Sequence, residues 1–118
     1  MIVDDEPFLA RAIKERLALE GFEVAVAADG LAGLAAADEF SPDLILLDLL
    51  MPKMDGMAML KKLRQGGRGK KTPVIILSNL NNDQARRDSL AAGANDFMTK
   101  INASLEDIAA VTKKQLKN

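Results

Sequence analysis

The chain of 118 residues contains no cysteine and no histidine. The first absence excludes disulfides, thiolate catalysis and zinc–sulfur sites. The second removes the most common general base and the most common ligand of transition metals. Any metal must therefore be held by oxygen, which favours Mg²⁺ or Mn²⁺.

Aromatic residues make up only 3% of the chain, with neither tryptophan nor tyrosine, which argues against a stacking platform for single-stranded nucleic acid. The 16 Lys and Arg residues nearly balance the 17 Asp and Glu residues, so the net charge is only -1 and gives no general attraction to nucleic acid or anionic membranes. No apolar run approaches the roughly 18 residues of a transmembrane helix, and no basic and apolar leader opens the chain. We expect a cytoplasmic protein that does not bind membranes and does not bind nucleic acid through this domain.

Apolar runs divide the chain into five predicted strands, at residues 1–3, 22–26, 44–47, 74–77 and 96–99. The runs at 44–47 and 74–77 are unbroken, which is typical of strands buried on both faces of a parallel sheet. A segment with helical spacing of apolar residues follows each strand, so the order is strand–helix five times over. Right-handed crossovers then favour an α/β fold with a doubly wound parallel sheet in order 2-1-3-4-5, helices on both faces, and the second and fifth strands at the edges.

Residues 1–118 are long enough for one domain with a single core. The first strand is short, since strands commonly run to about 5–6 residues, and this predicts a truncated start and reduced stability. We expect no further domain after the last helix in this sequence, and therefore a domain that works alone or that was excised from a longer protein. Near the start of that helix, Ser104 and Asp107 are close to a capping box.

Polar residues gather where the predicted strands end. Asp4 and Asp5 follow the first strand, Asp48 the third, Ser78 the fourth and Lys100 the fifth. In open parallel sheets the carboxyl ends of the strands carry the chemistry, and the proposed order brings the three carboxylates into one pocket. Their mutual repulsion calls for a hard divalent cation. A hydroxyl and an ammonium group suit phosphoryl oxygens, so the set contains the parts needed to form an aspartyl phosphate.

In these features the chain resembles the receiver domain of bacterial two-component response regulators. The resemblance rests on Val-Asp-Asp at 3–5, Leu-Asp at 47–48, Met-Pro-Lys-Met-Asp-Gly at 51–56 and Phe-Met-Thr-Lys at 97–100. It implies a flavodoxin-like (βα)5 three-layer sandwich and a phosphorylation-dependent signalling switch. An aspartate after a strand is by itself usually a turn residue, so the assignment depends on the whole set.

The resemblance also implies a role for each matching residue. Asp48 resembles the phospho-acceptor and a metal ligand, Asp5 the direct Mg²⁺ ligand, Asp4 its outer-shell partner, Leu50 the residue whose main-chain carbonyl completes the metal site, Ser78 the switch hydroxyl, Lys100 the lysine that neutralises the phosphoryl group, and Phe97 the aromatic switch. The implied phosphodonor is a sensor histidine kinase, a phosphotransfer protein or a small phosphodonor. A downstream protein would bind the surface of the fourth helix, fifth strand and fifth helix. Such a domain catalyses only its own phosphorylation and dephosphorylation and is not an enzyme in the usual sense.

The chain departs from the family pattern at two places. Ile101 follows Lys100 where the family usually has proline, often after a cis bond; because a cis bond before isoleucine costs about 2.5–4 kcal/mol, we expect a trans bond and a reshaped loop. Leu50 and Leu80 flank the acceptor and the switch hydroxyl, where many relatives carry polar groups. Since neither side chain can orient an attacking water, we expect a long-lived phosphoryl group.

Three other functions compete with this interpretation. A flavodoxin-like cofactor binder would need aromatic or hydroxyl-rich loops around its flavin. A Mg²⁺-dependent phosphatase with an aspartyl nucleophile typically carries a second aspartate two residues later, where this chain has Leu50. A receiver-like interaction module that is never phosphorylated is compatible with the altered loop after Lys100.

Overall fold

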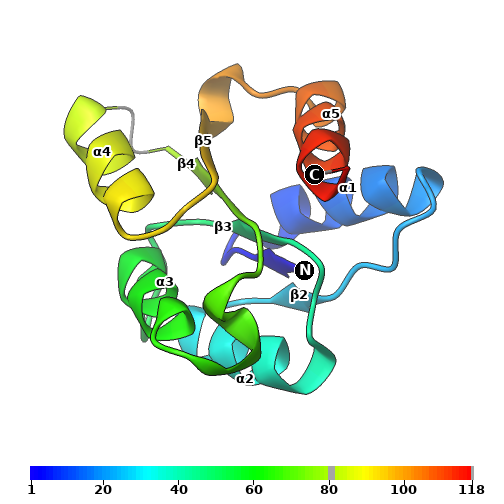
Figure 1. Ribbon diagram of the computed structural model, residues 1–118. Coiled ribbons are helices and arrows are strands. Elements are labelled where there is room, and N and C mark those ends of the chain that lie inside the picture. The colour runs from blue at the N-terminus through cyan, green and yellow to red at the C-terminus, as the bar shows by residue number, and fades with distance from the viewer. Residues whose placement is uncertain (80–81, 118) are drawn as a thin grey trace.

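The computed structural model describes residues 1–79 and 82–117. Five strands form one sheet in the order β2-β1-β3-β4-β5, and every neighbouring pair is parallel (Figure 1). The strands are β1 (Ile2–Val3), β2 (Val26–Ala27), β3 (Ile45–Leu47), β4 (Val74–Ser78) and β5 (Asp96–Thr99). The predicted α/β fold and its strand order 2-1-3-4-5 are confirmed.

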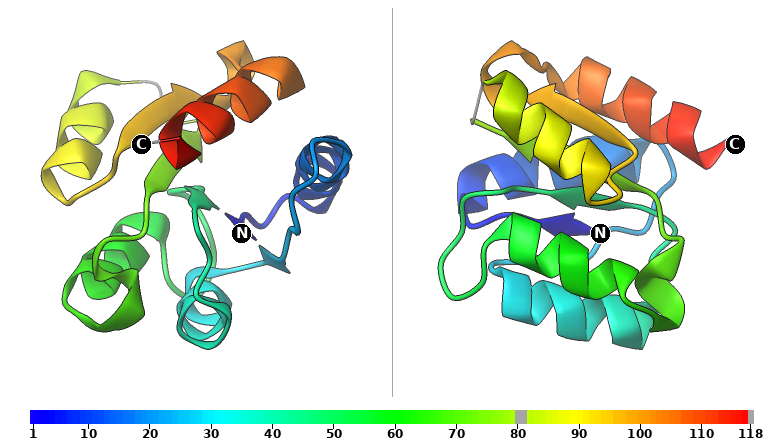
Figure 2. Two further views of the ribbon diagram at one scale, coloured as in Figure 1. Left: turned by 45° about the vertical axis from the view of Figure 1, so that its right-hand side comes forward. Right: turned by 60° about the vertical axis from the view of Figure 1, so that its left-hand side comes forward.

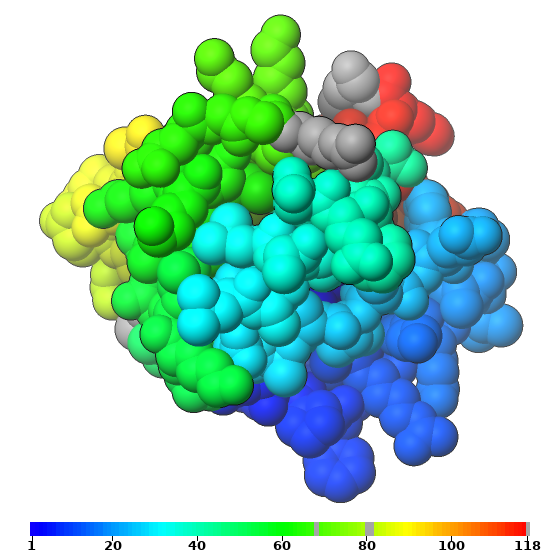
Figure 3. Space-filling view, turned by 90° about the horizontal axis from the view of Figure 1, so that it is seen from below, coloured from blue at the N-terminus to red at the C-terminus, as the bar shows by residue number. Residues whose placement is uncertain are grey.

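Helices cover both faces of the sheet (Figure 2). The α-helices are α1 (Pro7–Leu19), α2 (Gly30–Phe40), α3 (Gly56–Arg64), α4 (Asp83–Ala91) and α5 (Leu105–Leu116), and two short 3₁₀ helices are η1 (Gly67–Lys70) and η2 (Lys100–Asn102). α1 and α5 pack on one face, while α2 and α3 lie side by side on the other (Figure 3). None of the described helices is long and apolar enough to cross a membrane.

Alternation along the strands divides the core into two layers. In β3, Ile45 and Leu47 pack toward α2 and α3, whereas Leu46 between them packs toward α1 and α5. This follows from the period of two in a strand, which sends successive side chains to opposite faces. All three residues of β3 and all five of β4 are buried, as their unbroken apolar runs predict.

The predicted strand at residues 22–26 is wrong in extent. β2 includes only Val26 and Ala27, because its one neighbour, β1, offers just two residues for pairing. Phe22 and Val24 instead pack against the layer formed with α1 and α5. The short first strand therefore limits the strand beside it as well.

Polar side chains begin four of the five α-helices. The carboxylates of Asp29 and Asp55 accept hydrogen bonds from the backbone N–H groups of Ala32 and Ala58, both at 2.8 Å. Asn82 caps α4 in the same way. The Ser104 hydroxyl accepts a hydrogen bond from the backbone N–H of Asp107, and the Asp107 carboxylate accepts one from the backbone N–H of Ser104. The expected capping box is therefore present at α5.

Candidate functional site

The sheet register places the candidate acids together at the carboxyl ends of neighbouring strands. The backbone N–H of Asp48 donates to the carbonyl of Val3 at 2.9 Å, so the end of β3 lies beside the end of β1. Asp4 follows directly, and its N–H donates to the carbonyl of Ala27 at 3.0 Å. The side chains of Asp4, Asp5 and Asp48 each offer a carboxylate oxygen, and these oxygens lie within 4.8 Å of one another. Asp4 and Asp48 are buried, whereas Asp5 is exposed.

Lys100 reaches these acids from the end of β5. Its Nζ lies 2.9 Å from Oδ2 of Asp4 and 3.2 Å from Oδ2 of Asp48, and its side chain is only 5% exposed. No peptide bond among the described residues is cis, so the bond before Ile101 is trans, as expected. Lys100 begins the short helix η2 (Lys100–Asn102), and its side chain reaches the acid cluster from there. A reshaping of this loop relative to the family stays a prediction.

Burial and charge act against each other in this pair. Burial lowers the pKa of the Lys100 ammonium group, but the hydrogen bond to Asp4 and the charges of Asp4 and Asp48 outweigh it, and the pKa lies above its usual value. Burial raises the pKa of the Asp4 carboxyl, and the hydrogen bond from Lys100 opposes this without cancelling it. Lys100 therefore stays charged at neutral pH and neutralises part of the acid cluster.

Glu6 belongs to the site, although the sequence analysis does not include it. Its Oε1 lies 3.4 Å from Nζ of Lys100, and its backbone N–H donates to Oδ1 of Asp4 at 2.9 Å. The glutamate side chain is 49% exposed and forms the outer rim of the cluster. Its position directly after two acids at a strand end is the signal that could have identified it.

The loop between β3 and α3 supplies the remaining contacts of Asp48. The backbone N–H of Leu50 donates to Oδ1 of Asp48 at 3.3 Å, while its apolar side chain is 55% exposed. This bond bends the loop back over the carboxylate. Leu50 therefore lies beside the acceptor with its side chain toward solvent.

The two candidate switch residues lie on the strands next to the acid cluster. Ser78 ends β4, is fully buried and pairs in register with Thr99 of β5. Phe97 is also buried, and the guanidinium of Arg86 in α4 lies 5.9 Å from the centre of its ring. Their roles as switches stay predictions. Leu80, which was expected to flank the switch hydroxyl, lies outside the described residues.

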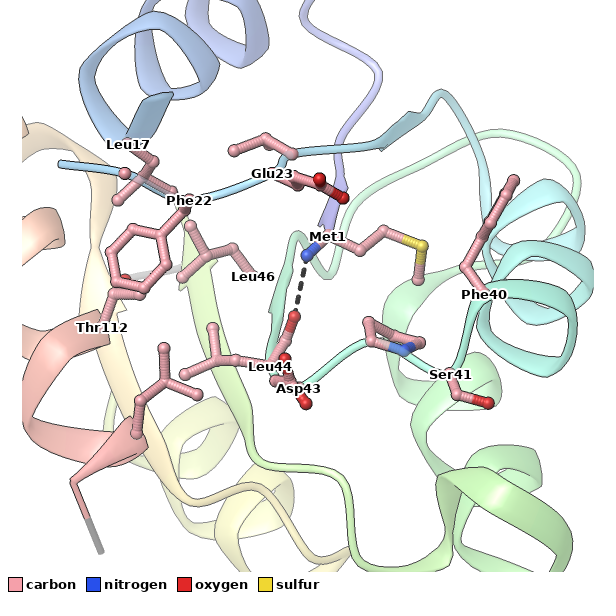
Figure 4. Close-up of a pocket in the computed structure, with 14 residues that line it drawn as sticks. Met1, Leu17, Phe22, Glu23, Phe40, Ser41, Asp43, Leu44, Leu46 and Thr112 are labelled. Atoms are coloured by element: carbon pink, nitrogen blue, oxygen red, sulfur yellow. Dashed lines mark hydrogen bonds between the residues drawn. The ribbon is translucent and has the colours of Figure 1, made fainter. Parts of the chain in front are cut away.

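The acid cluster suits a hard divalent cation. Its donor atoms are carboxylate oxygens from three residues, which matches the preference of Mg²⁺ for oxygen ligands. A groove of about 690 Å³ opens beside Asp4 and Asp5, between α1 and the β2 edge of the sheet. A further cavity of about 410 Å³ lies at the opposite end of the sheet, where the amine of Met1 donates to the carbonyl of Leu44 at 2.8 Å (Figure 4). Among the described residues, Asp4, Asp5, Asp48 and Lys100 come together at the first of these two ends.

Comparisons with known proteins agree with this geometry. The family model for the response regulator receiver domain matches residues 1–112. The transcriptional regulator RpaA of Synechocystis sp. is 37% identical over 85% of this chain, and the transcriptional regulatory protein CpxR of Klebsiella pneumoniae is 44% identical over 85%. The matched stretch spans only 42% of RpaA and 41% of CpxR, so this chain corresponds to less than half of each.

Solved structures show the same similarity over nearly the whole chain. The receiver domain of the Francisella response regulator 1452 superimposes with a TM-score of 0.90 at 32% identity, covering 98% of this chain and 93% of that one. The chemotaxis protein CheY4 of Vibrio cholerae superimposes with a TM-score of 0.89 at 28% identity, covering 96% and 93%.

Proposed function

This chain belongs to the receiver domains of two-component response regulators, which are phosphorylation-dependent signalling switches, and we propose that Asp48 is its phospho-acceptor. One observation carries this assignment. Asp48 combines a buried carboxylate with contacts to Lys100, at 3.2 Å, and to the backbone N–H of Leu50, at 3.3 Å. Asp4 has a comparable pair of contacts, so the choice of Asp48 rests also on its place at the end of the central strand β3, which matches the receiver pattern. A phosphoryl group on that carboxylate would therefore meet a cation and a backbone donor that are already in place.

In the proposed reaction, an oxygen of Asp48 attacks the phosphorus atom of the donor. The new oxygen–phosphorus bond forms as the bond between phosphorus and the donor breaks, and the donor leaves with that electron pair. Lys100 neutralises charge on the phosphoryl oxygens, since its raised pKa keeps it protonated at neutral pH. The domain acts on itself and turns over no metabolite.

We assign Mg²⁺ (or Mn²⁺) to the acid cluster. Asp5, Asp48 and the main-chain carbonyl of Leu50 would hold the ion, with Asp4 as an outer-shell partner. When bound, the ion neutralises the oxygens of the transferred group. The all-oxygen donor set and the placement of three carboxylates within 4.8 Å support this assignment.

Ser78 and Phe97 would transmit the conformational change caused by phosphorylation to the protein surface. We propose that the Ser78 hydroxyl closes on the phosphoryl group and that Phe97 changes rotamer with it, which shifts the population between two packings. Phe97 lies under Arg86 of α4, so its movement would be felt at the surface of α4, β5 and α5. A downstream protein would bind that surface.

The donor is proposed to be a sensor histidine kinase or a phosphotransfer protein. The comparisons support none of the cofactor-binding and phosphatase alternatives. A cytoplasmic location, expected from the sequence, stays a prediction, and so does the extent of the domain over residues 1–118.

Incubation with acetyl phosphate and Mg²⁺, followed by intact mass, tests the assignment. The parent should gain the mass of one phosphoryl group, and Asp48→Ala should gain none. Asp43→Ala is a matched control, because it removes an exposed acid just before the same strand and should react like the parent. No adduct on the parent would favour an interaction module that is never phosphorylated, and an adduct on Asp48→Ala would move the acceptor to another residue.

A further inference from the structure

The loop of residues 48–56, which joins β3 to α3, carries the proposed acceptor and the proposed carbonyl ligand. A glycine closes this loop on itself. The backbone N–H of Gly56 donates to the carbonyl of Leu49 at 2.9 Å, and a Cβ on Gly56 would overlap the carbonyl oxygen of Asp48. The two ends of the loop are therefore in direct backbone contact, which leaves only its tip free to vary.

The tip of the loop rests on the first turn of α2. The backbone N–H of Gly30, the first residue of that helix, donates to the carbonyl of Met54 at 3.2 Å. The first N–H groups of a helix have no partner within it, so this carbonyl satisfies one of them. A Cβ on Gly30 would overlap the carbonyl oxygen of Met54 and would lie 2.9 Å from its Cβ. Only glycine allows the two backbones to approach this closely.

A second contact holds the tip at the same place. Nζ of Lys53 lies 3.7 Å from Oδ2 of Asp29, the residue that caps α2. Lys53 itself has a φ of 66°, a left-handed conformation that is unfavourable for a residue with a side chain. The neighbouring contacts hold Lys53 in this conformation.

We infer that Gly30 and Asp29 of α2 position the loop of residues 48–56 for metal binding, Gly30 by close backbone contact and Asp29 through Lys53. The inference rests on the proposed roles of Asp48 and Leu50. Because Asp48 and Gly56 fix both ends of the loop, a displacement of Met54 is transmitted to the Leu50 carbonyl, which lies in the same short loop. Gly30 touches neither the acids nor Lys100 in any described contact, so it is a positioning residue.

Titration with Mg²⁺ by calorimetry tests the inference on the parent, Gly30→Ala and Gly69→Ala. The added methyl of Gly30→Ala pushes the tip of the loop away, and we expect Mg²⁺ affinity to fall about tenfold, as for other residues that orient metal ligands. Gly69→Ala is the control. Its methyl would overlap the side chain of Leu63, which lies at the end of α3 away from the 48–56 loop. The variant should lower the free energy of unfolding while Mg²⁺ affinity stays equal to that of the parent within experimental error, as expected where no ligand or its support is touched.

The possible results separate this inference from the proposed function. A parent that binds no Mg²⁺ would overturn the proposed metal site. If Gly30→Ala folds and binds Mg²⁺ as tightly as the parent, the positioning role alone is overturned. The same holds if Gly69→Ala loses as much Mg²⁺ affinity as Gly30→Ala. If circular dichroism shows that Gly30→Ala does not fold, Asp29→Asn decides. It keeps a helix cap but removes the charge facing Lys53, and an affinity lowered about twofold supports the inference, whereas unchanged affinity overturns it.

Discussion

Nζ of Lys100 lies 2.9 Å from Oδ2 of Asp4, although the two residues follow strands that are separated by two others in the sheet. Both side chains are nearly inaccessible to solvent, at 5% and 3% exposed. The long lysine side chain spans the ends of β3 and β4 to make this contact. The pair therefore connects the end of β5 to the end of β1, where the acid cluster lies.

Replacing Lys100 should destabilise the fold. Lys100→Met leaves the buried carboxylates of Asp4 and Asp48 without their cation, and breaking a buried pair in this way costs about 3 kcal/mol or more. Urea unfolding at pH 7 measures the loss. Loss of the cation should also raise the carboxyl pKa of Asp4 further in the folded variant, so the stability should recover as the pH falls and this carboxyl binds a proton. An unchanged free energy of unfolding at pH 7 would contradict the buried pair.

Neutralising Glu6 should speed phosphorylation by acetyl phosphate. Glu6 is the third carboxylate on Lys100, at 3.4 Å, and its negative charge faces an incoming phosphodonor that is itself an anion. Because the glutamate is half exposed, screening limits the effect, and we expect the rate for Glu6→Gln to rise about two- to threefold. Intact mass over time measures it, with Glu15→Gln as a control that removes a carboxylate paired with Arg11 outside the site. A slower reaction would show that Glu6 assists the transfer.

The phosphorylated domain should be long-lived. The Leu50 side chain beside Asp48 is half exposed but apolar, so it offers no group that could orient a water for attack on the phosphoryl group. Leu50→Asn supplies such a group and should shorten the lifetime by about tenfold, which is less than the effect of a positioned general base because an amide can orient a water but does not take its proton. The decay of the phosphorylated species by intact mass tests this. A parent that loses its phosphoryl group within seconds, with no change in the variant, would contradict the expectation.

Acid should remove one contact between α1 and α5. Glu20 at the end of α1 lies 2.6 Å from Nζ of Lys113 and 3.3 Å from Arg16, and the hydrogen bond from Lys113, followed by that from Arg16, holds the pKa of the glutamate below its usual 4.5. Since the folded pKa is depressed, the stabilisation is complete above pH 4.5 and is lost as the pH falls through the folded value.

Melting temperatures of the parent and Glu20→Gln across pH 3–7 check this expectation. The variant should melt at a lower temperature than the parent near neutrality, and the difference should vanish at the acid end. Glu39→Gln removes an exposed glutamate of α2 and should show no such dependence. A difference that persists at the lowest pH would point to packing instead of charge.

The sheet could be predicted from sequence because its central strands consist almost entirely of apolar residues. Residues 44–47 and 74–77 are unbroken apolar runs, which are typical of strands in a parallel sheet covered on both faces. The extent of β2 could not be predicted, since it depends on how many residues of β1 are available for pairing, and periodicity within residues 22–26 carries no information about that partner.

The site could be predicted as a set of strand ends but not in its contacts. Asp4, Asp48 and Lys100 meet as expected, because a parallel register brings strand ends together whatever the loops do. The third contact of Lys100, with Glu6, depends on how the chain leaves β1 and enters α1. The contact of Gly30 with the 48–56 loop depends on two backbones that meet at the start of α2. Neither kind of contact leaves a periodic pattern in the sequence.

The two-residue strand β1 has a consequence for dynamics. It lies inside the sheet, between β2 and β3, yet it pairs with each neighbour through only two residues, whereas β4 and β5 pair through four. Segments held by few backbone hydrogen bonds open locally at a lower free energy than the whole fold. Because Asp4 and Asp5 follow β1 directly, each such opening would disperse the acid cluster while β3, β4 and β5 remain paired. We therefore expect local opening of β1, which amide hydrogen exchange would measure, to set how long the assembled site persists between openings.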